Sequence, residues 1–215
     1  MTAHDARHAP AARVPVAPAL RVLVAQTWGE LVIRSRFPAF SVTSLALPVL
    51  LFTFFGLPLV GRRAAGDVDL GTLLLTSFAA YTVGQVMVFG FGIGVAIERG
   101  HRVDVLMRAT PMSAAVYLGS KVVVGMVFAL LALVVLFAYA AVVGGVRLAP
   151  GVLVGVVARL LVGALPLVAL GFAIGYTAGP NAAPAVANLV YLPLAFASGI
   201  FLPLERCRRS CSAWR

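Results

Sequence analysis

Charged side chains gather in one short stretch of this chain, residues 98–111, which lies between two long apolar runs. The stretch reads ERGHRVDVLMRATP, and 6 of its 14 residues are Glu, Asp, Arg or His. Because such a polar stretch cannot lie in hydrocarbon, we expect an aqueous loop between two membrane spans. The loop is short and ends in Pro111, so we interpret it as a docking element that offers ion pairs to a partner. A solvated loop without a partner is the alternative.

The residue types that carry out catalysis form no recognisable site. The sequence lacks the Gly-x-x-x-x-Gly-Lys-Ser/Thr loop that cradles phosphates, and it lacks the His-Glu-x-x-His zinc motif. The histidines His4, His8 and His101 fall in segments that we expect to be aqueous, and Cys207 with Cys211 is only half of a metal site. We therefore predict no catalytic residue, no metal site and no cofactor bound by this chain.

Composition places the chain among integral membrane proteins. Hydrophobic residues make up 61% of the 215 residues and charged residues 11%, whereas a soluble domain carries about 25% charged residues. The net charge of +10 comes from basic residues spread over the loops, where membrane topology places them. We therefore do not read that charge as a nucleic-acid site.

Five apolar runs are long enough to cross a bilayer, which takes about 20 helical residues. They cover roughly residues 38–60, 70–97, 115–143, 152–176 and 182–204. Residues 1–18 are interpreted as a disordered cytosolic tail. Residues 19–37, where Trp28 lies among arginines, are interpreted as an interfacial amphipathic helix, with a cytosolic linker as the alternative. The predicted fold class is all-α: a polytopic membrane protein with an interfacial helix and five spans, the permease domain covering residues 38–205.

The basic residues predict a cytoplasmic N-terminus. With that orientation nine of them lie inside and four outside, leaving out the tail after residue 205, as the positive-inside rule favours. Lys121 is counted inside and Arg159 outside. A charge at mid-membrane costs about 2.5–3.5 kcal/mol, so we expect Arg159 near the interface. The charged stretch 98–111 then faces the cytoplasm.

Few polar side chains fall in the predicted spans, and no Asp or Glu does. Ion-coupled carriers usually need an ionisable group inside the membrane, so a self-powered carrier is disfavoured. Tyr81, Gln85, Asn188 and Tyr191 are the candidates to line a path for an apolar substrate. Hydrogen bonding between helices is the alternative role for them.

Glycine and proline interrupt several spans. The stretches 90–94 and 171–175 both contain Gly-x-x-x-Gly, a spacing that lets helices approach closely. Ordinary helix packing is the first interpretation and a flexible gate the second. The prolines in or near spans are expected to kink or locally open them. These are Pro48, Pro58, Pro166 and Pro193.

Two segments resemble one transporter family. Glu98-Arg99 followed by Arg108-Ala109-Thr110-Pro111, between the second and third spans, resembles the cytoplasmic signature of class-2 ATP-binding-cassette (ABC) exporter permeases. Residues 179–205, GPNAAPAVANLVYLPLAFASGIFLPLE, are similar to the fifth-span region of drug- and antibiotic-export members. The resemblance extends over about residues 20–205.

The resemblance implies a permease of the bacterial plasma membrane in which two halves, expected to be a homodimer, pair around a central pathway. A separate ATPase subunit, holding ATP and Mg, would dock on the coupling segment 98–113 and drive export of a drug, an antibiotic or a lipid. Glu98 and Arg99 would lie at the membrane junction of that segment, Arg108 and Thr110 would face the ATPase, and Pro111 would end its helix. The alternative is a five-span scaffold or channel-like module without an ATPase partner.

The chain departs from the family pattern in two places. Members carry Gly-Thr or Gly-Trp in mid-motif, where this chain has Arg102-Val103. Members also continue into a sixth span, whereas here Glu205 is followed by RCRRSCSAWR, residues 206–215. We expect that tail to be out-of-frame translation and the permease to be truncated before its sixth span. A true five-span variant with a Cys207–Cys211 link is the alternative.

Overall fold

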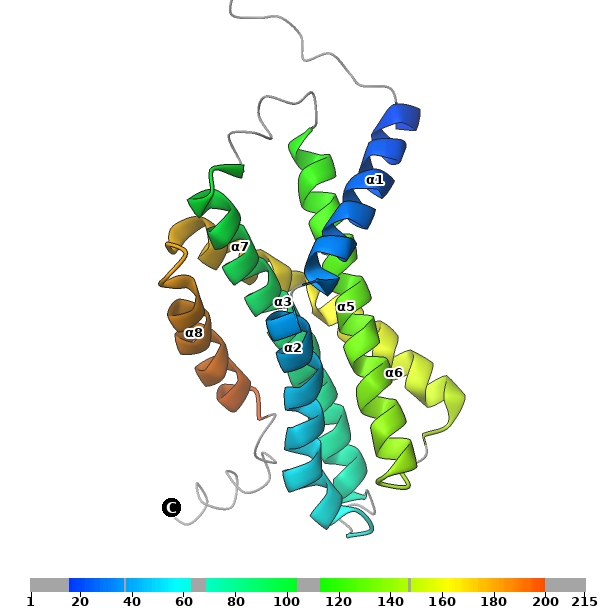
Figure 1. Ribbon diagram of the computed structural model, residues 1–215. Coiled ribbons are helices and arrows are strands. Elements are labelled where there is room, and N and C mark those ends of the chain that lie inside the picture. The colour runs from blue at the N-terminus through cyan, green and yellow to red at the C-terminus, as the bar shows by residue number, and fades with distance from the viewer. Residues whose placement is uncertain (1–15, 37, 63–68, 104–112, 147, 200–215) are drawn as a thin grey trace, which may run out of the picture.

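The computed structural model describes residues 16–36, 38–62, 69–103, 113–146 and 148–199. In chain order its helices are α1 (Val16–Ser35), α2 (Pro38–Leu51), the π-helical turn η1 (Phe52–Gly56), the 3-10 turn η2 (Leu57–Leu59), α3 (Leu70–Gly100), α5 (Ala114–Val142), α6 (Pro150–Gly163), α7 (Leu165–Thr177) and α8 (Ala183–Ala197) (Figure 1). No strand occurs in the described residues, so the all-α prediction is confirmed for them. Most of the predicted N-terminal tail, residues 1–15, lies outside the described residues. The predicted C-terminal tail, residues 206–215, lies outside them completely.

Three helical stretches are long and apolar enough to cross a membrane: Leu70–Gly100, Ala115–Val142 and Pro150–Thr177. They coincide with the second, third and fourth predicted spans. Two shorter apolar stretches, Ser44–Leu59 and Ala183–Ala197, lie where the first and fifth spans are predicted. The multi-pass membrane fold is thus supported by three helices, and the count of five spans stays a prediction.

The second predicted span is one unbroken helix. α3 begins after Asp69, whose carboxylate accepts a hydrogen bond from the Thr72 backbone N–H at 2.8 Å. The helix continues to Gly100 and includes Glu98 and Arg99. The prediction that a loop begins at Glu98 is therefore wrong, because Glu98 and Arg99 still belong to the helix and both side chains have partners on neighbouring helices.

The fourth predicted span is broken, as its proline suggests. α6 ends at Gly163, α7 begins at Leu165, and Ala164 lies between them. Pro166 is in the first turn of α7, where its missing N–H costs nothing but prevents a continuous hydrogen-bonded ladder.

The first and fifth spans also carry their prolines within helical structure. Pro48 lies inside α2, and the chain then passes into the π-helical turn η1 and the 3-10 turn η2, which contains Pro58. Pro193 lies inside α8. The expectation that prolines locally open the helices is confirmed at Pro58, where a 3-10 turn replaces the α-helix, whereas α2 and α8 continue through Pro48 and Pro193.

α3 is the central helix, and the other helices surround it (Figure 1). Its closest neighbour is α7, which approaches it through glycines. A Cβ built on Gly171 would lie 2.8 Å from the Met87 carbonyl oxygen, and one built on Gly175 would lie 2.8 Å from Cβ of Val95. The Gly-x-x-x-Gly spacing in α7 therefore serves close helix packing, which was the first interpretation of that motif.

Candidate functional site

A buried ion-pair cluster joins α1, α3 and α5 close to the C-terminal end of α3. Lys121 on α5 is fully buried. Its Nζ donates to Oε1 of Glu30 on α1 at 2.6 Å and to Oε1 of Glu98 on α3 at 2.5 Å. The Tyr117 hydroxyl donates to the second carboxylate oxygen of Glu98. We call Glu30, Glu98, Tyr117 and Lys121 the ion-pair cluster.

The charges around this cluster are balanced. Nε of Arg34 lies 3.7 Å from Oε2 of Glu30, one helical turn away on α1, so two carboxylates face two cations. The Tyr117 ring adds a contact, because Nζ of Lys121 lies 4.8 Å from its centroid. Buried charges are tolerated only when they are paired and hydrogen-bonded in this way.

Lys121 had been counted as a basic residue of the cytoplasmic side. The structure shows that Lys121 lies inside α5, where its side chain has an exposed fraction of 0%, and its side of the membrane stays a prediction. Two acidic side chains from other helices neutralise it there. Removing Lys121 from the charge count leaves eight basic residues inside against four outside, so the predicted orientation still follows from the same rule.

The inward side of α1 is mixed. It carries Glu30 and Arg34 together with Leu31, which packs against the apolar core, whereas Trp28 and Ile33 are 69% and 61% exposed. Large apolar side chains on the outer side of a helix suit an apolar surrounding such as the edge of a bilayer. The interfacial placement of this helix stays a prediction.

Arg99 ties the same end of α3 to α7. Its Nη1 donates to the carbonyl oxygens of Gly175, at 3.0 Å, and of Tyr176. Its guanidinium carbon lies 5.7 Å from the centroid of the Tyr176 ring. A cation at the last carbonyls of a helix satisfies free acceptors and complements the helix dipole. Glu98 and Arg99, adjacent in sequence, therefore connect α3 to helices on different sides of it.

The second residue after the end of α3 has an unusual backbone. Arg102 has φ of +55°, in the left-handed region that favours glycine. This is the position at which the resemblance leads us to expect Gly. The other residues carried over from the family, Arg108, Thr110 and Pro111, lie outside the described residues, and their roles stay predictions.

The predicted pathway residues fall into two groups. Tyr81 and Gln85 on α3 and Tyr191 on α8 are buried, and the Tyr191 hydroxyl donates to the Tyr81 carbonyl oxygen at 2.7 Å. Asn188 is exposed and its side-chain amide donates to the Pro184 carbonyl oxygen within the same helix. Tyr191 thus makes the hydrogen bond between helices that was the alternative to a pathway role, and lining a path remains a prediction for all four.

Sequence reasoning missed Glu30, Tyr117 and the buried state of Lys121. One signal was present: Lys121 is the only lysine in the chain and the only charged residue of the run 114–142. A lone charge in an apolar helix indicates a partner on another helix. The sequence does not indicate which partner, because Glu30 is 91 residues away.

Comparison with known proteins addresses the family directly. A sequence model of the family described as "ABC-2 type transporter" matches residues 21–214. The chain belongs to the ABC-2 type transporter family. It is also similar to a protein of Bacillus subtilis (strain 168) named "Putative transport permease YvfS", with 27% identity over 188 residues that cover 86% of this chain and 76% of that protein. No solved structure matches the chain.

Membership of the ABC-2 family confirms the resemblance carried by residues 98–111 and 179–205. It makes this chain a transport permease with several membrane helices, the subunit type that works with an ABC ATPase.

Proposed function

We propose that this ABC-2 permease exports a hydrophobic substrate and is driven by an ATPase subunit that docks on residues 98–113. The observation that carries the proposal is the ion-pair cluster, because it lies where that segment leaves α3. Glu98 is bound to Lys121 at 2.5 Å, and Lys121 is bound to Glu30 at 2.6 Å. A displacement of the end of α3 is therefore passed to α5 and α1.

The physical basis is the cost of separating buried charges. Removing one partner from a buried ion pair costs about 3–5 kcal/mol, since the other charge is left uncompensated. A push on the segment 98–113 therefore moves α1, α3 and α5 together more easily than it pulls them apart. Arg99 extends the same connection to α7 through the Gly175 carbonyl. Four helices are thereby linked to one short cytoplasmic segment.

The rest of the proposal concerns the assembly and its substrate. Two copies of the chain would pair around a central pathway in the bacterial plasma membrane, with the N-terminus in the cytoplasm and with ATP and Mg bound by the partner ATPase. The described residues between α3 and α8 near Tyr81 and Tyr191 are mainly apolar, which supports a drug, antibiotic or lipid as the substrate.

Capture of the ATPase tests the docking segment. When the permease is purified from cells that also produce the ATPase encoded beside it, Arg108→Glu should reduce the co-purified ATPase about tenfold, since a charge reversal opposes a paired contact. Arg62→Glu is the matched control: Arg62 is exposed, and its carbonyl accepts a hydrogen bond from Leu70 at the opposite end of α3. Glu98 is a poor choice for this test because it belongs to the ion-pair cluster.

Either outcome of that capture has a consequence. Equal capture by the wild-type protein and Arg108→Glu would remove the docking role from Arg108. If even the wild-type protein captures no ATPase, a scaffold or channel-like module takes the place of the exporter. Transport itself is tested by ATP-dependent uptake of a lipophilic dye into inside-out membrane vesicles, where export appears as accumulation in the lumen.

A further inference from the structure

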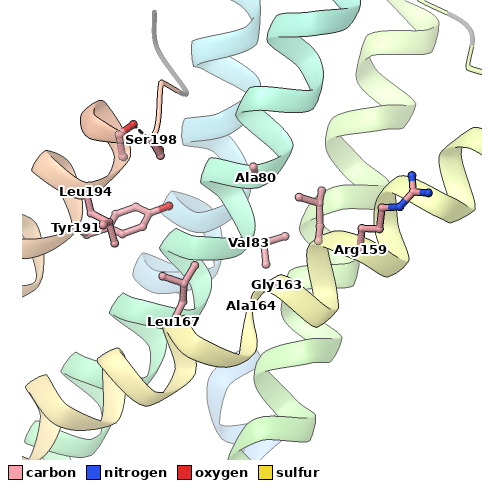
Figure 2. Close-up of a pocket in the computed structure, with 11 residues that line it drawn as sticks. Ala80, Val83, Arg159, Gly163, Ala164, Leu167, Tyr191, Leu194 and Ser198 are labelled. Carbon is pink, nitrogen blue, oxygen red and sulfur yellow. Dashed lines mark hydrogen bonds between the residues drawn. The ribbon is translucent and has the colours of Figure 1, made fainter. Parts of the chain in front are cut away.

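A cavity of about 240 Å³ lies between α3, α6, α7 and α8, away from the ion-pair cluster. Figure 2 shows Arg159 at one end of it, with its exposed guanidinium directed away from the cavity, and Tyr191 with Ser198 at the other end. The wall between these ends is apolar and includes Val83 and Leu167. The Tyr191 hydroxyl is already bonded to the Tyr81 carbonyl oxygen. Arg159 is the charged residue of the lining.

The break in the fourth span creates this space. Gly163 and Ala164 line the cavity at the point where α6 gives way to α7, and neither residue has a side chain large enough to fill it. A Cβ built on Gly163 would meet no heavy atom within 4 Å. The cavity reaches the molecular surface, where Leu194 is 45% exposed, next to the exposed apolar side chains of α6 and α7.

Arg159 carries a charge that the described part of the chain does not balance. It is the only charged residue of the apolar stretch Pro150–Thr177. The acidic side chains among the described residues are Glu30 and Glu98, which belong to the ion-pair cluster, and Asp69, which caps α3. A cation within an apolar stretch is costly unless an anion pairs with it.

The size and chemistry of the cavity decide what could bind. Sites for drug-sized ligands measure about 300–1,000 Å³, so this cavity is too small for one. A second copy of the chain would have to offer an exposed carboxylate, and the described residues hold none. Part of an acyl chain fits an apolar cavity that opens among exposed apolar side chains, because the rest of the chain can stay among those side chains. A phosphate is an anion that a guanidinium binds through two parallel hydrogen bonds.

We propose that this cavity binds an anionic phospholipid from the bilayer, with one acyl chain between α3 and α8 and the phosphate paired with Arg159. The lipid supplies the negative charge that the described residues lack. The acyl chain fills the gap left by the helix break. This proposal does not depend on the ATPase partner, so it can fail or succeed separately from the proposed transport function.

Native mass spectrometry of the full chain in detergent tests the charge. The protein is equilibrated with equal amounts of phosphatidylglycerol and phosphatidylcholine that carry the same acyl chains. The wild-type protein should retain phosphatidylglycerol in preference, and Arg159→Gln should bind it about tenfold more weakly, which is about 1.4 kcal/mol. Binding of phosphatidylcholine, whose phosphate is balanced by its own choline cation, should fall less. Arg62→Gln, the same change at an exposed site outside the cavity, should behave as the wild-type protein.

A second pair of variants tests the cavity without touching the charge. Gly163→Leu places a side chain into the cavity and should reduce retention of phosphatidylglycerol. Gly151→Leu is the matched control on α6, since a Cβ there also meets nothing within 4 Å and Gly151 does not line the cavity. The proposal would be overturned if Arg159→Gln and Gly163→Leu each retained as much phosphatidylglycerol as the wild-type protein. It would also be overturned if the wild-type protein showed no preference for the anionic lipid. If the spectra instead show a protein dimer that is present in the wild-type protein and in Gly151→Leu but lost in Gly163→Leu, a second copy of the chain occupies the cavity and the proposal is overturned.

Discussion

Lys121 holds its ammonium group between carboxylates from two other helices, out of contact with water. We expect Lys121→Met, which keeps most of the side-chain volume, to lower the free energy of unfolding by about 3–5 kcal/mol, because Glu30 and Glu98 are left without their cation. Denaturant titration of the purified protein in detergent measures this. The double variant Lys121→Met with Glu98→Gln should lose less than the sum of the two single variants. A loss below about 1 kcal/mol for Lys121→Met would contradict the buried cluster.

Arg102 adopts a left-handed backbone conformation at the end of α3, with φ of +55°. This backbone conformation costs a residue with a Cβ about 1–2 kcal/mol, whereas glycine adopts it without that cost. Arg102→Gly should therefore raise the free energy of unfolding by about 1 kcal/mol, measured in the same titration. The neighbouring control His101→Gly, at φ of −87°, should lower it. If both variants lower it, the left-handed conformation is not the dominant effect at position 102.

Asp69 makes the stability depend on pH. Burial by itself would raise the pKa of Asp69, but hydrogen bonds from Thr72, Gly61 and Gly71 lower the pKa below its usual value. A lowered folded-state pKa means that the contribution is complete above the unfolded pKa of about 3.9 and is lost as the pH falls through the folded value.

We therefore expect Asp69→Ala to cost about 1 kcal/mol near pH 7, the usual value of an N-cap, and almost nothing at a pH well below 3.9. The measurement is the difference in free energy of unfolding between the wild-type protein and the variant across pH, which cancels pH effects that the two proteins share. A difference that stays constant down to low pH would contradict the assignment.

Single residues show where sequence reasoning stops. Glu98 and Arg99 were singled out from the sequence as a junction, and both do connect α3 to its neighbours. Their partners were not predictable, because Lys121 and Gly175 come next to them only through the packing of whole helices. A charged residue in sequence looks the same whether water or a buried counter-charge surrounds it.

At the scale of elements, the contact between α3 and α7 depends on missing side chains. A Cβ on Gly171 would lie 2.8 Å from the Met87 carbonyl and 2.9 Å from Cβ of Phe91. Gly171→Ala should therefore destabilise the protein by about 1–3 kcal/mol through overpacking. Gly163→Ala, on α6 with nothing within 4 Å, should instead stabilise it by up to about 1 kcal/mol. Thermal unfolding in detergent compares the two, and equal effects would contradict the close approach.

Helix positions were largely predictable, and helix continuity was not. Apolar runs mark α3, α5 and the α6–α7 pair to within a few residues, because a span needs about 20 apolar residues. Pro166 indicated the break at Ala164, since proline cannot continue the ladder. The extension of α3 through Glu98 was missed, because the buried lysine that stabilises it belongs to another helix.

At the scale of the whole molecule, the family of the chain and the contacts at the end of α3 bear on the same function. The ABC-2 family makes the chain a transport permease. The ion-pair cluster and Arg99 connect α1, α5 and α7 to the end of α3. Coupling to an ATPase through residues 98–113 is what we propose from the two together, and it is the central claim.

Photo-crosslinking from position 108 tests that claim most directly. A photoreactive amino acid replaces Arg108, or Arg62 as the control at the other end of α3, in cells that produce the neighbouring ATPase with a tag. After illumination, the account predicts a covalent product of one permease and one ATPase from position 108 and none from position 62. A product from position 62 alone, or from neither position while the complex can still be purified, would contradict it.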